Sequence, residues 1–111
     1  MREIKIGNKS FNVHYGQNAL CALEDALDES IDSIVKRFIS AKVALKDFRA
    51  IVWAGLLKEH RNMTLDALGD ICDAANVRFS DIVSPCFEEL IASYERLIPD
   101  AENGKEADSK N

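Results

Sequence analysis

The sequence predicts an α+β fold that is mostly α, with an N-terminal β-hairpin packed on a bundle of about five helices. The main observation is a change of hydrophobic period: apolar residues alternate with a period of two over residues 3–15. From Asn18 to about Ile98 they recur instead at i, i+3 and i+4, as on the buried face of a helix. With 111 residues, 47% of them hydrophobic, the chain suits one domain with a modest core.

The hairpin is expected over residues 2–15. Its first strand carries Ile4 and Ile6, and its second carries Phe11, Val13 and Tyr15. Between them Gly7-Asn8-Lys9 supplies the turn residues of a hairpin. An isolated hairpin is marginally stable in water, so this one is expected to pack on the helices that follow.

Helix starts are indicated by side chains that can accept a hydrogen bond from the first turn, at Asn18, Ser30 and Thr64. The third helix is expected from about Ala44 to His60, as the longest central element. The last helix should run to about Ile98, starting either at Ser84-Pro85 or near Ser80 with a kink at the proline. The expected core stripes of the five helices are, in order, Leu20, Leu23 and Leu27; Ile31, Ile34, Val35 and Phe38; Leu45, Phe48, Ile51, Val52 and Leu56; Leu65, Leu68, Ile71, Cys72 and Ala75; and Phe87, Leu90, Ile91, Tyr94 and Leu97.

A second apolar arc on the third helix suggests a site for a protein partner. Ala50, Trp53 and Leu57 fall together, roughly 100° around the helix from its main stripe. A helix that is apolar over so much of its circumference is either central in the bundle or carries a binding surface. Both interpretations stay open, and the second makes Trp53, Leu57 and Ala50 the candidate partner-binding residues.

Charge and composition divide the chain unevenly. Residues 1–60 carry nine Lys/Arg against eight Asp/Glu, whereas residues 61–111 carry five against eleven. Residues 99–111 contain no large apolar side chain, which predicts a disordered acidic tail after a single globular domain of residues 1–98. An acidic C-terminal half is unsuited to phosphate backbones and compatible with protein partners.

No residue pattern indicates catalysis, a cofactor or a metal site. Neither His14 nor His60 has a ligand at metal-binding spacing, and the glycines form no phosphate-binding loop. Three cysteines at unpatterned spacings, Cys21, Cys72 and Cys86, are expected to be small core residues in a reducing compartment. No leader or membrane span is evident, so the expected location is the cytoplasm.

One segment permits an alternative function as a small helix-turn-helix DNA-binding regulator. Residues 71–77 mimic the tight turn of that motif, which makes residues 78–85 the recognition helix. That helix would offer Arg78 and Asp81 to the bases and would be interrupted by Pro85. The basic stretch from Lys36 to Arg49 is expected to be a solvated face.

The order of these features resembles the tail assembly chaperones of long-tailed phages, in the branch related to the tail-gene product of gene transfer agents. The resemblance covers about residues 2–97. It rests on the opening hairpin (residues 2–6 and 11–13), on Ala22-Leu23-Glu24-Asp25-Ala26-Leu27, on the stretch from Leu45 to Leu56 with its Trp53-Ala54-Gly55-Leu56, and on the two closing helices, Leu65 to Ala75 and Phe87 to Tyr94.

The resemblance implies a non-enzymatic role in the morphogenesis of a phage or prophage tail, in the cytoplasm of the host bacterial cell. Such chaperones bind the tape measure protein, keep its helical apolar surfaces soluble and help recruit tail tube subunits. They use no cofactor, and a homo-oligomer is possible. Some members of the branch are labelled tail tube proteins, but a tube subunit needs a large sheet and this chain has residues for one hairpin.

Overall fold

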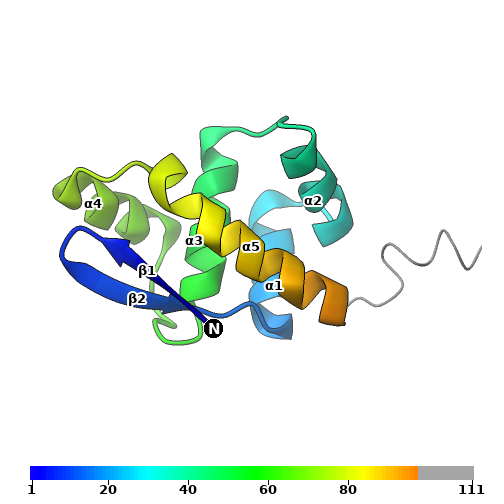
Figure 1. Cartoon of the computed structure of the whole chain (residues 1–111), viewed down its shortest axis with the longest axis horizontal. Helices are drawn as coiled ribbons and strands as arrows, with labels where there is room; N and C mark the ends of the chain where they lie inside the picture. The colour runs from blue at the N-terminus through cyan, green and yellow to red at the C-terminus, as the bar shows by residue number, and fades with distance from the viewer. Residues whose placement is uncertain (98–111) are drawn as a thin grey trace, which may run out of the picture.

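The computed structural model describes residues 1–97, which form a two-stranded antiparallel hairpin followed by five helices (Figure 1). This is the α+β, mostly α fold that the change of hydrophobic period predicts. The expected tail of residues 99–111 lies outside the described residues. The elements are β1 (Arg2–Ile6), β2 (Lys9–Val13), α1 (Gln17–Leu27), α2 (Ile31–Ile39), α3 (Leu45–Leu56), α4 (Leu65–Ala75) and α5 (Phe79–Leu97).

The hairpin pairs Ile4 with Phe11 across a two-residue turn of Gly7 and Asn8. Gly7 has a φ of 66°, the left-handed conformation that such turns require. Because strand side chains alternate, Ile4, Ile6, Phe11 and Val13 all face one side, and all four are buried. That side packs on the helices: β1 contacts α4 and α5, and β2 contacts α3.

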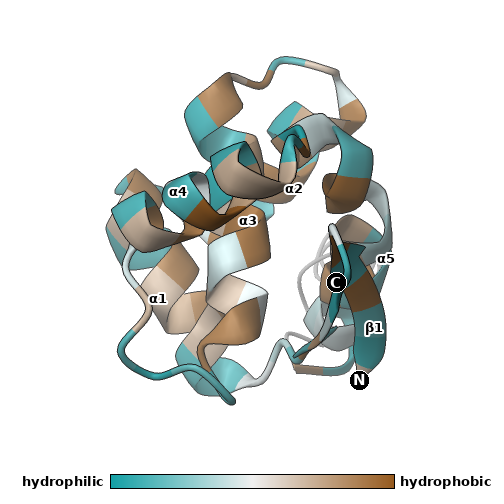
Figure 2. Cartoon of the chain, turned by 90° about the vertical axis from the view of Figure 1, so that its left-hand side faces the viewer, coloured by the Kyte–Doolittle hydropathy of each residue, from teal (hydrophilic) through white to brown (hydrophobic). Residues whose placement is uncertain are grey.

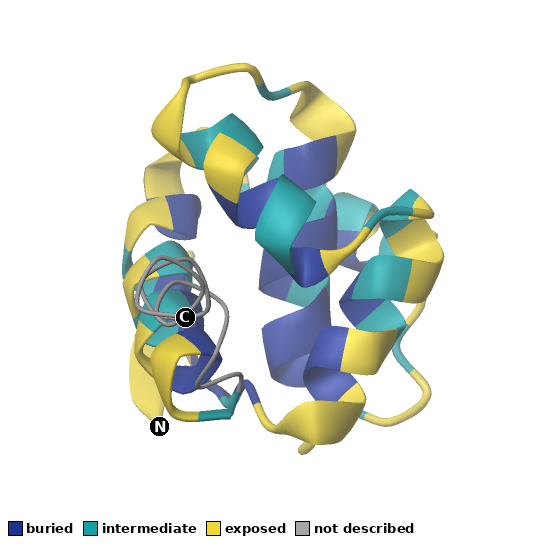
Figure 3. Cartoon of the chain, turned by 90° about the vertical axis from the view of Figure 1, so that its right-hand side faces the viewer, coloured by how far each residue is buried: buried dark blue, intermediate teal, exposed yellow. Residues whose placement is uncertain are grey.

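Helix α3 is the centre of the molecule and contacts α1, α4, α5 and the hairpin. Seven of its twelve residues are buried, on more than one side of the helix. In Figure 2 its hydrophobic segments lie between α1 and α5. In Figure 3 the buried segments, in dark blue, gather toward the middle of the molecule and the exposed ones lie mostly at its periphery. The wide apolar circumference of α3 thus reflects mainly a central position.

Several sequence-based boundaries need correction. Helix α1 begins at Gln17, and Gly16 rather than Asn18 precedes it as the N-cap residue. Helix α3 ends at Leu56 and not at His60, because residues 57–59 form a turn. Leu45, expected in the core stripe, is the first residue of α3 and is 66% exposed.

Helix α5 starts at Phe79 and contains Pro85, so the earlier of the two predicted starts is the right one. Proline removes one backbone donor, which would have bonded to the carbonyl of Asp81 four residues earlier. Asp81 lies in the exposed first turn of α5, where water can satisfy that carbonyl. The proline therefore does not end the helix.

Candidate protein-binding surfaces

The three predicted partner-binding residues lie in different surroundings. Ala50 is 1% exposed and belongs to the core, so it offers no surface to a partner in the folded chain. Trp53 is half-buried, and its indole Nε1 donates a hydrogen bond of 2.8 Å to the carbonyl of Met63. That bond fastens the connector between α3 and α4, so Trp53 has a structural role in addition to its exposed edge.

Leu57, by contrast, borders an open groove of about 800 Å³. The groove lies where the start of α1 meets the turn that follows α3, and is lined by His14, Gly16, Gln17, Asn18, Ala19, Leu57, Lys58 and Arg61. Lys58 and Arg61 make its wall basic, and the first turn of α1 carries no acidic side chain. Leu57 with these two cations suits an apolar segment that carries acidic residues.

The sequence gives little warning of this groove, because its two walls are about forty residues apart along the chain. At one side of the groove, His14 Nε2 lies 3.0 Å from a carboxylate oxygen of Glu59. The one signal in the sequence is Leu57, which lies on the second apolar arc of the third helix. The structure adds that no side chain caps the start of α1 at Gly16, which favours negative charge nearby.

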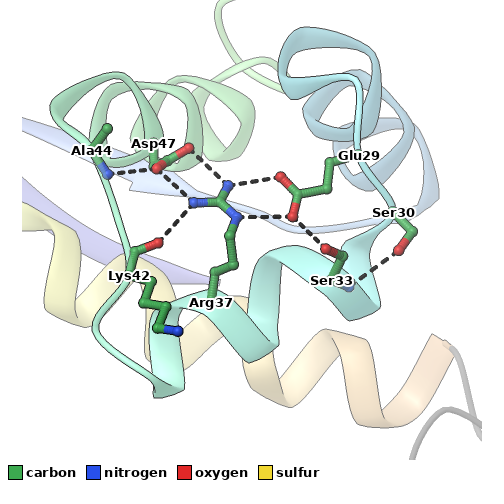
Figure 4. A network of polar contacts seen from close by, with 7 residues as sticks. All are labelled: Glu29, Ser30, Ser33, Arg37, Lys42, Ala44 and Asp47. Carbon is green, nitrogen blue, oxygen red and sulfur yellow. Dashed lines mark hydrogen bonds and ion pairs between the residues drawn. The ribbon is translucent and has the colours of Figure 1, made fainter.

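A second candidate surface lies at the connector between α2 and α3, where Arg37 is bound between two carboxylates (Figure 4). The guanidinium donates two hydrogen bonds of 2.8 Å to Glu29 and two, of 2.9 and 3.0 Å, to Asp47. A fifth, of 2.9 Å, goes to the carbonyl of Lys42 in the connector. We call Glu29, Arg37 and Asp47 the arginine clamp, since together they hold the α1–α2 loop, α2 and the start of α3.

The clamp changes the acidity of its members. Hydrogen bonds from Arg37 lower the pKa of Asp47, which is 1% exposed, and the backbone N–H of Ala44 lowers it further. The pKa of Glu29 is lowered by its hydrogen bonds from Arg37 and Ser33. Both carboxylates raise the pKa of Arg37. All three groups therefore stay charged at neutral pH, and the one cation between two carboxylates leaves the clamp with one net negative charge.

Around the clamp the connector exposes apolar side chains. Ile39 is 73% exposed and Leu45 is 66% exposed, and with Met1 they are the exposed large hydrophobic residues of the described chain. Beneath them, Phe38 stacks on Phe87 at a centroid distance of 5.0 Å and meets Phe48 edge-on at 5.9 Å. The connector itself runs as an exposed segment over the top of the molecule (Figure 3).

The described residues offer little for catalysis. Within residues 1–97, no group of three His, Cys, Asp or Glu side chains could hold a metal ion. Burial raises the pKa of Cys72 and raises that of Cys86 to about 11, which makes both poor nucleophiles. Cys21 is exposed, contrary to the prediction of three core cysteines.

The junction between α4 and α5 is as tight as the helix-turn-helix alternative requires, but the described part of α5 presents no surface suited to reading DNA. Asn76 has a φ of 57° and ends α4, and α5 begins three residues later. Arg78, the one cation offered there, is bound to Asp81 at 3.0 Å. The exposed positions that follow it in the first turns of α5 are Ser80, Asp81 and Ser84. A surface of that composition lacks the cations that phosphate contacts need.

No helix among the described residues is long and apolar enough to cross a bilayer. No curated protein and no solved structure matches the chain significantly. The family model described as "Phage tail tube protein, GTA-gp10" matches residues 2–91, which span the hairpin, α1 to α4 and most of α5. The chain therefore belongs to this family of phage tail proteins.

Proposed function

We propose that this phage tail protein is an assembly chaperone, non-enzymatic, that binds the tape measure protein and helps to recruit tail tube subunits in the host cytoplasm. The observation that carries the proposal is the fold: within residues 1–97 the sheet has two strands, both in one short hairpin. A wall of packed subunits built from extended sheet needs many more strands per copy. A small helical body with accessible apolar residues suits transient binding of a helical client.

The client site that we propose includes Leu57 and the exposed edge of Trp53. Leu57 borders the groove with Lys58 and Arg61, and Trp53 lies one helical turn before it on α3. An aromatic and an aliphatic anchor beside two cations would receive an amphipathic helix with acidic flanks. Ala50 is left out of this site because it is buried.

Co-expression with the tape measure protein of the same phage tests the proposal. Alone, the tape measure protein should be largely insoluble, and the full-length chain should keep it soluble and copurify with it. Leu57→Ser should abolish copurification while the chain still melts cooperatively. Ile91→Ser on α5 is the matched control, because Ile91 is also half-buried and lies away from the groove lining. Loss of capture by Ile91→Ser instead would move the site to α5.

The family description supports a second candidate, a structural subunit of the tail tube. Mass spectrometry of purified tails separates the two. A chaperone is absent from finished tails, or present in trace amounts, whereas a wall subunit is among their most abundant proteins. Abundant recovery of this chain from finished tails would overturn the chaperone proposal.

A further inference from the structure

The connector between α2 and α3 carries a surface that neither the core nor the groove at Leu57 uses. Ile39, Lys42, Val43, Leu45 and Lys46 form what we call the connector patch. Ile39 and Leu45 are the two most exposed large hydrophobic residues after Met1. An exposed aliphatic side chain is ordinary by itself, but two at the ends of one short connector form a contiguous segment of unusual composition.

The patch is also basic, although the protein as a whole is acidic. The chain has a net charge of −5, yet residues 36–46 contain four Lys/Arg and no Asp or Glu. Arg37 is neutralised inside the clamp, and Lys36 pairs with Asp32 at 3.0 Å. Lys42 and Lys46 are exposed, and neither forms an ion pair within residues 1–97. Lys46 interacts electrostatically with Asp47 without forming an ion pair, and both lysines remain accessible to a partner.

Hydrogen bonds hold the backbone of the connector in a conformation that is unfavourable at Ala41. Ala41 has a φ of 60°, which is unfavourable for a residue with a Cβ atom. The N–H groups of Ala41 and Lys42 bond back to the carbonyls of Phe38 and Arg37, at 3.1 and 2.8 Å. Arg37 holds the Lys42 carbonyl, and Asp47 accepts the Ala44 N–H at 2.6 Å. Because these hydrogen bonds already order the connector, less conformational entropy is lost when a partner binds to it.

The same hydrogen bonds restrict how a partner can bind. The connector's backbone groups at residues 41, 42 and 44 are already paired, so an added β-strand would find few free donors and acceptors there. Contacts must come from side chains instead, which is how an amphipathic helix binds. The exposed lysines favour acidic residues in that helix.

We propose that the connector patch is a docking surface for an acidic amphipathic helix of a partner protein. Ile39 and Leu45 contact the apolar face of that helix, and Lys42 and Lys46 pair with its carboxylates. The surface is distinct from the groove at Leu57, and the inference does not depend on the proposed chaperone activity. Two lysines on a chain of net charge −5 do not suit a nucleic acid or an anionic membrane.

Two labelled synthetic peptides of about 18 residues, long enough for five helical turns, provide the test. Both carry leucine at i, i+3, i+4 and i+7; one has glutamate and the other has lysine on its polar face. Fluorescence anisotropy with the full chain should give micromolar affinity for the glutamate peptide and at least tenfold weaker binding of the lysine peptide.

Ile39→Ser with Leu45→Ser should weaken the glutamate peptide about tenfold or more with the melting temperature nearly unchanged, because both side chains are exposed. Lys42→Glu with Lys46→Glu should invert the preference toward the lysine peptide. All measurements use the Leu57→Ser background, so that the other groove does not contribute to binding. The matched control is Lys5→Glu with Lys9→Glu, the same charge change at two exposed lysines of the hairpin, which should leave both affinities unchanged.

Three results would overturn the inference. One is equal binding of both peptides, or binding that the patch variants do not alter. Another is a concentration-dependent dimer that Ile39→Ser with Leu45→Ser dissociates while no peptide binds, which would make the patch a contact between copies of this chain. The third is patch-dependent binding to phosphatidylserine vesicles in the absence of peptide binding.

Discussion

At the scale of single residues, one close contact decides whether the hairpin can join the helices. Tyr15, just after β2, is 2% exposed, and its hydroxyl donates a 2.6 Å hydrogen bond to the Ile51 carbonyl of α3. Its side chain lies across Gly55, where an added Cβ would come within 2.6 Å of both the ring carbon Cζ and the hydroxyl oxygen. The preceding residue, His14, donates its backbone N–H to the Gly55 carbonyl at 2.8 Å. Gly55 is thus required for packing rather than for a special backbone angle.

Gly55→Ala should therefore destabilise the protein by about 1–3 kcal/mol, even though alanine favours helices. Gly69→Ala is the matched control in α4, because its Cβ would meet its nearest neighbour, a Phe79 ring carbon, at 4.0 Å. There the gain in helix propensity should stabilise by about 0.5–1 kcal/mol. Urea denaturation of both variants measures the two shifts, and shifts of equal sign would contradict the packing explanation.

Ala41 is a second residue whose identity conflicts with its conformation. Helices α1, α2 and α4 each end near a left-handed residue, respectively Asp28, Ala41 and Asn76. Aspartate and asparagine tolerate that conformation better than alanine does. Ala41→Gly should raise stability by about 1 kcal/mol, seen as a higher urea midpoint. Ala92→Gly, at an exposed interior position of α5, should lower stability by about the same amount.

At the scale of elements, local capping was predictable at Ser30 and Thr64 but not at Asn18, and long-range contacts were not predictable. Ser30 and Thr64 accept hydrogen bonds from Ser33 and Ala67 at 3.1 and 3.0 Å, as the sequence predicts. Leu45 was assigned to the core because a helical wheel shows direction but not where a helix extends beyond its neighbours. The clamp escaped prediction because Glu29, Arg37 and Asp47 come from three different elements, and their charges looked like a solvated face.

The clamp should matter more for stability than its surface position suggests. Arg37→Met leaves the buried carboxylate of Asp47 without a counter-charge, and should cost about 3–5 kcal/mol. Lys36→Met, one residue away, removes an exposed i,i+4 pair and should cost less than about 0.5 kcal/mol. Adding Asp47→Asn to Arg37→Met should recover part of the loss, because it removes the buried charge. Equal effects of the Arg37 and Lys36 variants in thermal melts would contradict this account.

At the scale of the whole molecule, the sequence predicted the class of fold because each period of hydrophobicity reports one kind of element. It did not show which exposed residues would gather, since that depends on how α3 sits among its neighbours. The sequence places Ala50, Trp53 and Leu57 on one arc of one helix. In the structure, Leu57 borders a groove, Ala50 is buried in the core and Trp53 is half-buried against the connector between α3 and α4. Periodicity fixes positions around a helix axis, and tertiary packing decides which arcs remain accessible.

The junction of β2, α3 and α5 gives the whole fold a dependence on alkaline pH. Burial raises the pKa of Tyr15, which interacts with Cys86, and raises the pKa of Cys86 from 9.0 to about 11. Each folded pKa lies above its unfolded value, so the folded state binds more protons in this range. The stability that these groups contribute is complete below about pH 9 and is lost as pH rises through the folded values.

Between pH 9 and 10 the loss should come mainly from Cys86, with a smaller share from Cys72, whose pKa burial also raises. Tyr15 contributes less in this range, because the unfolded tyrosine titrates only near 10. The free energy of unfolding should then fall by at most about 1.4 kcal/mol per pH unit for Cys86 alone. Cys86→Ala should be less stable at pH 7, because it leaves a small cavity, but its stability should decline less steeply between pH 9 and 10. Val83→Ala, at another buried position of α5 but without a titratable group, should also be less stable yet keep the wild-type slope. Urea titrations at four pH values measure the slopes, and an unchanged slope in Cys86→Ala would mean that this thiol does not govern the alkaline loss.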